Sequence, residues 1–293
     1  MARIVHLSDL HQQLDWGRRS FFSTGWRGAL GRFELHGLGR LARFEGVQAR
    51  LEQLVDDLHA LDADHIVVTG DVSALGHEDE VGRVEELLRP LLAAGRLTVI
   101  PGNHDRYTDS PSARVFERLF APWLGSALPE LAVEGPYPFV RLVGDGVALI
   151  GLDSTRVSGW SHYVVGRLGA RQLEAARAAL HHPKLAGRTV FVLSHHGPLG
   201  PSGRFDWIHS GLLDARGLLD VLHERPAVLL HGHSHERYWH RRDGGRPHLL
   251  GAGSSTEKGR EGYWVVEFDD HHALEAHAYL PGRRRAGGNQ TRP

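Results

Sequence analysis

Five polar clusters stand directly after five apolar runs of similar length. The clusters are, in chain order, Asp9 with His11, Asp71, Asn103 with His104, His195, and His233 with His235. Carboxylate, amide and imidazole groups together suit ions such as Mn, Fe or Zn, whereas an all-oxygen set would favour Mg or Ca. These residue types predict a metal site, provided that the fold brings the clusters together.

The apolar runs indicate how the clusters could meet. Residues 66–69 have high strand propensity, and Gly70 permits the turn that presents Asp71. Because open α/β sheets build their sites at the carboxyl ends of strands, parallel strands would place all five clusters at one edge. A single cluster is more often structural than ligating, and Asp9 with His11 alone would suggest a capped turn. Five clusters in register favour one shared site.

Hydrophobic periodicity predicts the elements that would position these clusters. Apolar residues recur at helical spacing in residues 47–61, which completes a β-α-β unit whose right-handed crossover gives parallel strands. Further helices are predicted at 78–94, 112–120, 170–180 and 214–223. Strands are predicted at 4–7, 66–69, 97–100, 139–143, 147–152, 190–193, 227–230, 248–252, 263–268 and 273–279.

The composition excludes several classes of protein. The chain has 293 residues, of which 41% are apolar and 24% charged, as in ordinary globular proteins. Without cysteine it has no disulfide, thiolate metal site or cysteine nucleophile. A net charge of −1 gives no global field for nucleic acid, so no nucleic-acid partner is expected. No signal-peptide core or membrane-spanning run is visible, so a cytoplasmic protein is predicted.

Two segments differ in composition from the rest. Residues 16–46 interleave six aromatic residues with six arginines. We predict that they form a cap-like insertion in a single domain of residues 1–281. The alternative is a peripheral membrane or lipid contact through residues 17–45, because basic and aromatic residues together suit a headgroup boundary. Residues 282–293 are rich in Gly and Arg and are predicted to be a disordered tail.

The motif series resembles the calcineurin-like metallophosphoesterase superfamily. Its Asp-x-His, Gly-Asp, Gly-Asn-His-Asp, His and Gly-His-x-His motifs stand here as Asp9-Leu10-His11, Gly70-Asp71, Gly102-Asn103-His104-Asp105, His195, and Gly232-His233-Ser234-His235. The likeness covers residues 3 to 236 and is greatest to bacterial stand-alone phosphohydrolases. It implies an α/β fold, a two-sheet αββα four-layer sandwich with helices on both outer faces.

The resemblance also implies a role for each motif residue. One metal ion would be held by Asp9, His11 and His235, the second by Asn103, His195 and His233, and both would be bridged by Asp71. His195 is preferred to His196 because the family's ligand precedes a proline by a few residues at the strand end. His104 would act as general acid or as a clamp on the phosphoryl oxygens. Asp105 would orient His104, as carboxylates commonly orient imidazoles near metals.

These roles imply a phosphoester hydrolase that needs no protein nucleophile. Two divalent or mixed-valence ions of Mn, Fe or Zn, about 3.5–4 Å apart, can clamp the attacking and leaving oxygens and lower the pKa of water to about 7, so that hydroxide attacks. We predict a phosphodiesterase for a small nucleotide or lipid-linked phosphoester. The alternatives are a nuclease on single-stranded ends, which would need a basic groove, and a non-catalytic scaffold, which should show replaced ligands.

Two departures from the family's motifs argue against two subclasses of the superfamily. Residues 70–76 lack the Arg with which the protein phosphatases of the superfamily continue the Gly-Asp motif, so a phosphoprotein phosphatase is not expected. Ala74 stands where purple acid phosphatases carry a metal-binding Tyr, so an iron–tyrosinate site is not expected either.

Candidate substrate contacts lie beyond the motifs. They are Arg204, Trp207 and His209, which follow the His195 strand, and Trp160, His162 and Tyr163, which follow Asp153. An Arg can bind phosphate bidentately and an aromatic ring can stack on a base. The alternative for each is an ordinary residue of a surface loop.

Overall fold

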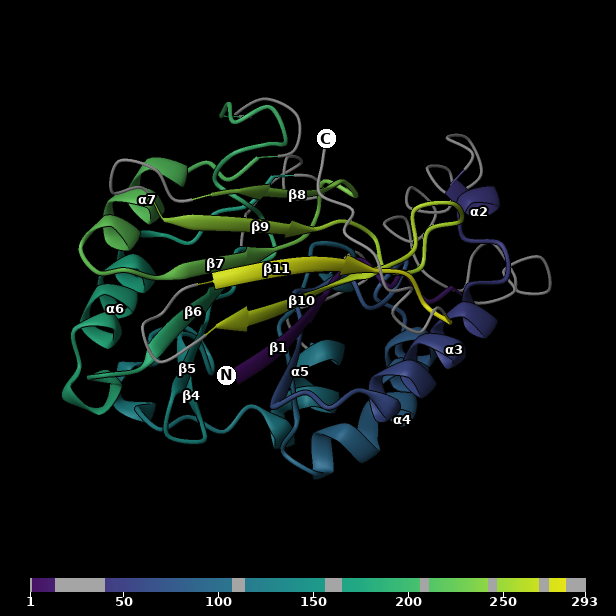
Figure 1. The fold of residues 1–293 in the computed structure, drawn as a ribbon, viewed down its shortest axis with the longest axis horizontal. Helices are drawn as coiled ribbons and strands as arrows, with labels where there is room; N and C mark the ends of the chain where they lie inside the picture. Colours follow the sequence, from purple (N-terminus) through teal and green to yellow (C-terminus); the bar gives the residue numbers. More distant parts are fainter. Residues whose placement is uncertain are drawn as a thin grey trace.

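Two mixed β-sheets pack face to face at the centre of the molecule (Figure 1). The computed structural model describes residues 2–13, 40–106, 114–155, 165–205, 211–241, 247–268 and 274–282. The first sheet has the order β11-β10-β1-β2-β3. Its strands are β1 (Ala2–Leu7), β2 (His65–Val68), β3 (Leu97–Val99), β10 (Tyr263–Phe268) and β11 (Leu274–Tyr279). β1, β2 and β3 are parallel, as the β-α-β unit predicts, and β10 pairs antiparallel with β1.

The second sheet has the order β4-β5-β6-β7-β9-β8. Its strands are β4 (Phe139–Val143), β5 (Val147–Gly151), β6 (Thr189–Leu193), β7 (Val228–His231), β8 (Arg237–His240) and β9 (His248–Ala252). The four central strands are parallel, and the edge strands β4 and β8 run antiparallel to their neighbours. β8 is the strand that the periodicity did not predict.

Helices cover the outer face of each sheet. α3 (Val47–Ala60), α4 (Glu78–Ala93) and α5 (Val115–Phe120) pack against the first sheet, and α6 (Ala170–Leu180) and α7 (Ala215–His223) against the second. The predicted αββα four-layer sandwich is therefore confirmed. The short helices are α2 (Arg40–Arg43) and the 3₁₀ turns η3 (His104–Arg106), η4 (Ala121–Trp123), η5 (Pro129–Leu131) and η7 (Pro183–Leu185).

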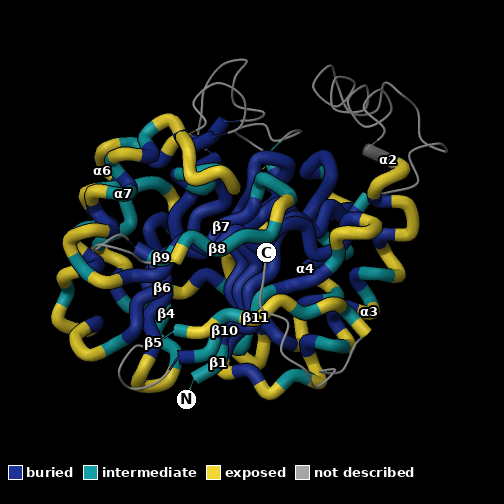
Figure 2. Tube along the Cα trace, turned by 45° about the horizontal axis from the view of Figure 1, so that its top comes forward, coloured by how far each residue is buried: buried dark blue, intermediate teal, exposed yellow. Residues whose placement is uncertain are grey.

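Alternate residues of each strand enter different layers of the core, because successive side chains point to opposite faces. On β1, Val5 packs under the helices while Ile4 lies between the sheets. On β6, Val192 packs under α6 and α7 while Phe191 lies between the sheets. Most strands are accordingly buried on both faces, whereas the edge strands β8 and β11 are only partly buried, and exposure is otherwise concentrated on the helices and loops (Figure 2).

Several predictions on the remaining segments stay untested. Residues 14–39 of the expected insertion, the tail from 283 onward, and residues 107–113, where an expected helix should start, lie outside the described residues. The domain limits therefore stay a prediction. In the part of the chain that the structure describes, no helix is both long and apolar enough to cross a bilayer.

Candidate metal centre

Loops at the carboxyl ends of parallel strands carry the five polar clusters, and the loops bend sharply. Among the described residues, six non-glycine residues have positive φ. Five of the six belong to the clusters: Asp9 at 54°, His11 at 44°, Asp71 at 53°, His233 at 72° and His235 at 55°. The left-handed region costs roughly 1–2 kcal/mol for a residue with a Cβ atom. Strain of this kind persists where the surrounding structure enforces it, and it gathers at functional sites.

Two motif glycines allow these loops to come close together. A Cβ atom at Gly102 would collide with Oδ1 of Asp71, and one at Gly232 would collide with Oγ of Ser8. The Gly-Asn-His-Asp turn therefore lies directly against the Asp71 loop, and the Gly-His-x-His turn lies directly against the loop that follows β1. Glycine at these positions is required by contact between loops rather than by a local turn.

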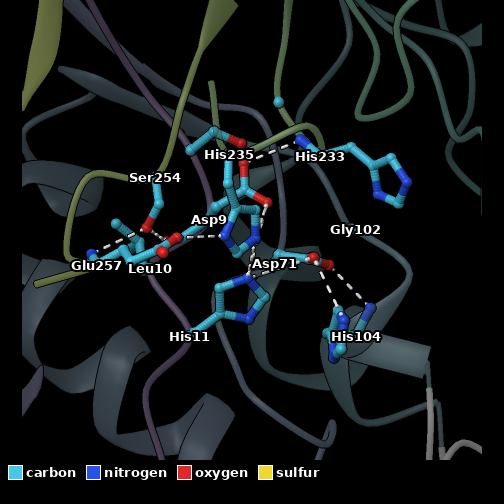
Figure 3. Close-up of polar contacts among 12 residues, drawn as sticks. Asp9, Leu10, His11, Asp71, Gly102, His104, His233, His235, Ser254 and Glu257 are labelled. Atoms are coloured by element: carbon cyan, nitrogen blue, oxygen red, sulfur yellow. Dashed lines mark hydrogen bonds and ion pairs between the residues drawn. The ribbon is translucent and has the colours of Figure 1, made fainter. Parts of the chain in front are cut away.

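One group of ligand atoms gathers around Asp9 (Figure 3). Nε2 of His11 lies 2.9 Å from Nε2 of His235. Oδ1 of Asp9 lies 3.4 Å from Nε2 of His235 and 3.7 Å from Nε2 of His11. The Asp9 Oδ1 atom is buried and has no hydrogen-bond partner among the described residues. Such an orphaned buried oxygen, facing two imidazole nitrogens, fits a place for a cation.

A second group gathers around Asn103. Its Oδ1 atom lies 3.0 Å from Nε2 of His195 and 3.0 Å from Nδ1 of His233. The other nitrogen of His195, Nδ1, lies 2.7 Å from the carbonyl oxygen of Thr69, to which it can donate. In the neutral ring, that bond leaves Nε2 of His195 with its lone pair directed at the group, which is the usual tautomer of a ligating histidine.

Asp71 lies between the two groups. Its Oδ2 atom is 3.4 Å from Nε2 of His195 and 3.7 Å from Nε2 of His11. Its Oδ1 atom accepts the backbone N–H of His104 at 2.8 Å. A single carboxylate therefore lies between two clusters of candidate nitrogen and oxygen ligands, which come from the ends of β1, β3, β6 and β7.

The electrostatics favour an anionic pair of carboxylates. Burial by itself would raise the pKa of Asp71, but the charges of His195 and His104 outweigh it and hold that pKa well below its usual range. Burial opposes ionisation of Asp9 in the same way, and its contacts with His11 and His235 lower its pKa well below the usual range. The site thus keeps two buried negative charges, as a pair of cations would require.

His195 and His233 are driven in opposite directions. Burial opposes protonation of both, but the Asp71 carboxylate raises the pKa of His195 to about 9. Burial, followed by the charge of His195, lowers the pKa of His233 to about 3. Both rings contact Asn103, so the difference arises because His195 also makes a direct contact with the Asp71 carboxylate.

The structure separates His195 from its neighbour His196. His196 lies with Nδ1 2.8 Å from the hydroxyl of Ser154, while His195 faces both Asp71 and Asn103. His196 also has a ring nitrogen near those of His195 and His233, so it belongs to the same buried neighbourhood. The contacts with the shared carboxylate favour His195 as the ligand candidate.

His104 is oriented differently from the prediction. The expectation that Asp105 orients His104 is wrong, because Nδ1 of His104 lies 2.8 Å from the carbonyl oxygen of Ala74. The Asp105 carboxylate instead accepts the backbone N–H groups of Ser73 at 2.9 Å and Gly102 at 2.9 Å, and the Ser73 hydroxyl at 2.7 Å. Burial and then the charge of Asp71 raise the pKa of Asp105 to about 6. Asp105 therefore holds the Asp71 loop and the Gly102 turn together.

A further strand end contributes residues that sequence reasoning missed. After β9, the buried Glu257 places Oε2 2.7 Å from Nδ1 of His235. Ser254 and Thr256 donate their hydroxyls to the carbonyl oxygens of Asp9 and Leu10 at 2.7 and 2.6 Å. Figure 3 shows Ser254 and Glu257 beside His235. The available signal was the polar run 254–257 at the end of an apolar strand, the same pattern that marked the other clusters.

The candidate substrate residues are less defined. Arg204 is exposed, and its carbonyl oxygen accepts the N–H of Gly200 at 2.9 Å. Trp207, His209 and the residues 160–163 lie outside the described residues. Their contact with substrate stays a prediction.

Comparison with known proteins places the chain in a family. The sequence pattern of the calcineurin-like phosphoesterase family matches residues 2–237, so the chain belongs to that family. A search of curated proteins gives no significant match. The chain is therefore a metal-dependent hydrolase of phosphoric esters, and the His and Asp groups described above fit its metal site.

Solved structures show the same fold. A dimetal phosphatase from Danio rerio is 15% identical with a TM-score of 0.59, covering 90% of this chain and 92% of its own. A purple acid phosphatase from yellow lupin is 14% identical with a TM-score of 0.58, and a sulfate thiohydrolase from Thermus thermophilus is 18% identical with a TM-score of 0.53. These two matches cover 94% and 96% of this chain but only 51% and 56% of the longer proteins.

Proposed function

We propose that this protein hydrolyses phosphodiesters with the help of two divalent ions. The observation that carries the proposal is the position of Asp71, whose Oδ2 atom faces His11 of one ligand group and His195 of the other. One carboxylate shared by two nitrogen-rich clusters is the arrangement that a two-ion site needs. Ions held there supply Lewis-acid charge and lower the pKa of water, and Mn, Fe or Zn suits the mixed donors.

Each ligand group has a distinct composition. Asp9, His11 and His235 would form one set, and Asn103, His195 and His233 the other, with Asp71 common to both. Glu257 supports the first set, because a carboxylate that accepts the Nδ1 proton of His235 fixes the tautomer and makes Nε2 a better donor to an ion. The carbonyl of Thr69 does the same for His195 in the second set.

His104 is the candidate proton donor. Its Nε2 atom lies 4.0 Å from Oδ2 of Asp71, while Nδ1 lies against the carbonyl of Ala74. With Nδ1 held there, Nε2 is presented at the edge of the shared carboxylate, where a leaving oxygen would develop charge. His104 can protonate that oxygen or hold it by a hydrogen bond.

A monoanionic diester suits the site better than a dianionic monoester. The cation nearest to His104 along the chain is Arg106, and it is engaged elsewhere. Its guanidinium bonds both carboxylate oxygens of Glu117, contacts Asp153 at 3.1 Å and donates to Thr155 at 3.2 Å. Since this charge is already neutralised by two carboxylates, it cannot balance a second negative charge on the substrate.

Hydrolysis of two chromogenic esters tests the proposal. Protein purified without chelator and supplied with Mn should hydrolyse bis-p-nitrophenyl phosphate, a diester, with a higher kcat/KM than p-nitrophenyl phosphate, a monoester. Metal analysis should find two ions per chain. A single tightly bound ion, or faster hydrolysis of the monoester, would contradict the proposal.

The identity of the physiological ester stays open between a small nucleotide and a lipid-linked phosphoester. The lipid alternative draws on the arginine- and aromatic-rich residues 17–45. Co-sedimentation with liposomes of the intact chain and of a chain lacking those residues tests it. Equal sedimentation of the two proteins would remove the lipid alternative, and a cytoplasmic location stays a prediction.

A further inference from the structure

A cavity of about 70 Å³ adjoins His233, one of the proposed metal ligands. It lies at the carboxyl end of β7, where His231 and His233 meet the loop that follows β6 and the ring of Tyr238 from β8. Leu199 and Pro201 form the apolar part of its wall, and glycine backbone forms much of the rest. The cavity therefore adjoins the candidate metal centre at His233.

His231 gives this cavity a polar wall. It is 1% exposed, and its Nε2 atom has no hydrogen-bond partner among the described residues. Its other nitrogen, Nδ1, makes only a long contact of 3.3 Å with the carbonyl oxygen of Gly232. A buried imidazole nitrogen without a partner is destabilising, and His231 is one of the residues that line the cavity.

The lining also restricts what can enter. The described residues that line the cavity include no carboxylate, lysine or arginine side chain, so a charged group would find no counterion among them. Polar atoms are available from His231 and Ser234, and the Tyr238 hydroxyl already donates to the carbonyl oxygen of Leu199 at 2.6 Å. An apolar cavity of about 150 Å³ binds benzene, so a space of about 70 Å³ suits a smaller group of a few non-hydrogen atoms.

We propose that this cavity binds the organic group of the phosphoester substrate, and that this group is small, uncharged and hydroxylated. Its hydroxyl bonds the imidazole of His231, and its carbon atoms contact Leu199 and Pro201. The inference rests on the proposed function, because His233 joins the cavity to the site where the phosphoryl group would sit. It assigns the selection of substrates to the β7 end and the loop after β6.

A series of p-nitrophenyl phosphodiesters tests the assignment. The second ester group on the phosphate is methyl, 2-hydroxyethyl, 2,3-dihydroxypropyl or phenyl, while the chromogenic p-nitrophenyl group stays the same. The p-nitrophenyl and phenyl rings are too large for the cavity, so the smaller alcohol occupies it. We expect kcat/KM to be roughly 5- to 10-fold higher for the two hydroxylated esters than for the methyl ester, which is the value of about one hydrogen bond.

Two substitutions separate the polar wall from the space itself. His231→Phe removes the bonding nitrogen and keeps the ring, so it should remove the preference for the hydroxylated esters. Leu199→Trp fills the cavity, so it should lower kcat/KM for the 2,3-dihydroxypropyl ester by about 10-fold or more and spare the methyl ester. Leu131→Trp, at another partly buried leucine of the same core cluster but outside the cavity lining, is the control. Metal content and melting temperature show that each variant is folded.

The outcomes distinguish this inference from the function on which it rests. If wild-type protein hydrolyses all esters at equal kcat/KM, the cavity selects nothing and the inference fails while the function stands. The same holds if Leu199→Trp slows every ester equally. If no ester is hydrolysed by metal-loaded protein, the proposed function fails and the inference fails with it.

Discussion

Buried histidines occupy two regions of this molecule, and the regions differ in what faces the rings. Between the sheets, Nε2 of His6 lies 3.0 Å from the hydroxyl of Thr69, and Nε2 of His65 lies 2.8 Å from that of Thr98. At the strand ends, His11 and His195 face carboxylate oxygens at 3.4 to 3.7 Å. All four rings are at most 1% exposed.

The difference in neighbours reverses the effect of burial. Burial, with the nearby charges of Arg141 and Arg96, lowers the pKa of His65 to about 3. Burial acts on His195 in the same sense, yet the carboxylate of Asp71 raises its pKa to about 9. Burial of a histidine is therefore no sign of function. A shared carboxylate and a left-handed backbone turn are what set the strand-end region apart.

Asp71→Asn should have the largest effect on metal binding and activity at the strand-end region. The shared negative charge disappears, so both ligand groups lose their common member, and ions and activity should be lost together. The loss of activity should exceed the roughly 10²- to 10⁴-fold effect expected for one proton donor. Metal analysis and ester hydrolysis measure both effects, and Asp56→Asn on the exposed face of α3 is the control. Full metal content in Asp71→Asn would show that the carboxylate is not shared.

His104→Ala should separate chemistry from metal binding. The imidazole bonds the carbonyl of Ala74 and lies beside Asp71 without belonging to either proposed ligand set. Turnover should therefore fall by roughly 10²- to 10⁴-fold while both ions remain bound. Metal content and kcat of the purified variant decide the matter. Empty metal sites in this variant would mean that His104 is a ligand.

Glu257→Gln should have a smaller effect. The amide keeps the shape of the side chain but removes the charge that supports His235, so metal affinity or activity should fall by roughly 10- to 100-fold. Metal titration followed by activity measures the change. Glu261→Gln, in the same loop, is the matched control and should titrate like the wild type. Indistinguishable titrations for Glu257→Gln and wild type would assign Glu257 to packing alone.

His65→Phe should leave the metal centre intact and alter only the pH dependence of stability. The folded pKa of His65, about 3, lies below its unfolded value of 6.5. Its neutral form therefore contributes stability above pH 6.5, and that contribution is lost as pH falls from 6.5 towards 3. Removing it should make the fall in unfolding free energy shallower by up to ~1.4 kcal/mol per pH unit in this window.

Denaturant unfolding between pH 4 and pH 7 measures this slope. Val67→Ala, in the same layer between the sheets, is the control, because it should lower stability equally at every pH. If the unfolding free energies of His65→Phe and wild type fall in parallel with pH, protonation of His65 is not coupled to stability. Ester hydrolysis by His65→Phe at neutral pH should match that of the wild type.

Much of this site could be predicted from the sequence, since the clearest signals were local. The turn Gly102-Asn103-His104-Asp105 follows an apolar run. Its amide, imidazole and carboxylate side chains indicate a functional site without any information from the rest of the chain. The helix at 47–61 could be predicted because the spacing of its apolar residues shows which face is buried. β8 could not be predicted in this way, because Arg237–His240 is a half-buried edge strand in which apolar and polar residues do not clearly alternate.

The sequence by itself determined the order of the strands and helices apart from β8, the residue types at each strand end, and hence a candidate metal-binding edge. Only the tertiary structure decided which groups meet there: Glu257 beside His235, Ala74 in place of Asp105 against His104, and His195 rather than His196 facing the shared carboxylate. The physical reason is chain separation. His11 and His235 lie 224 residues apart, so their contact depends on how two sheets pack, which no local pattern records.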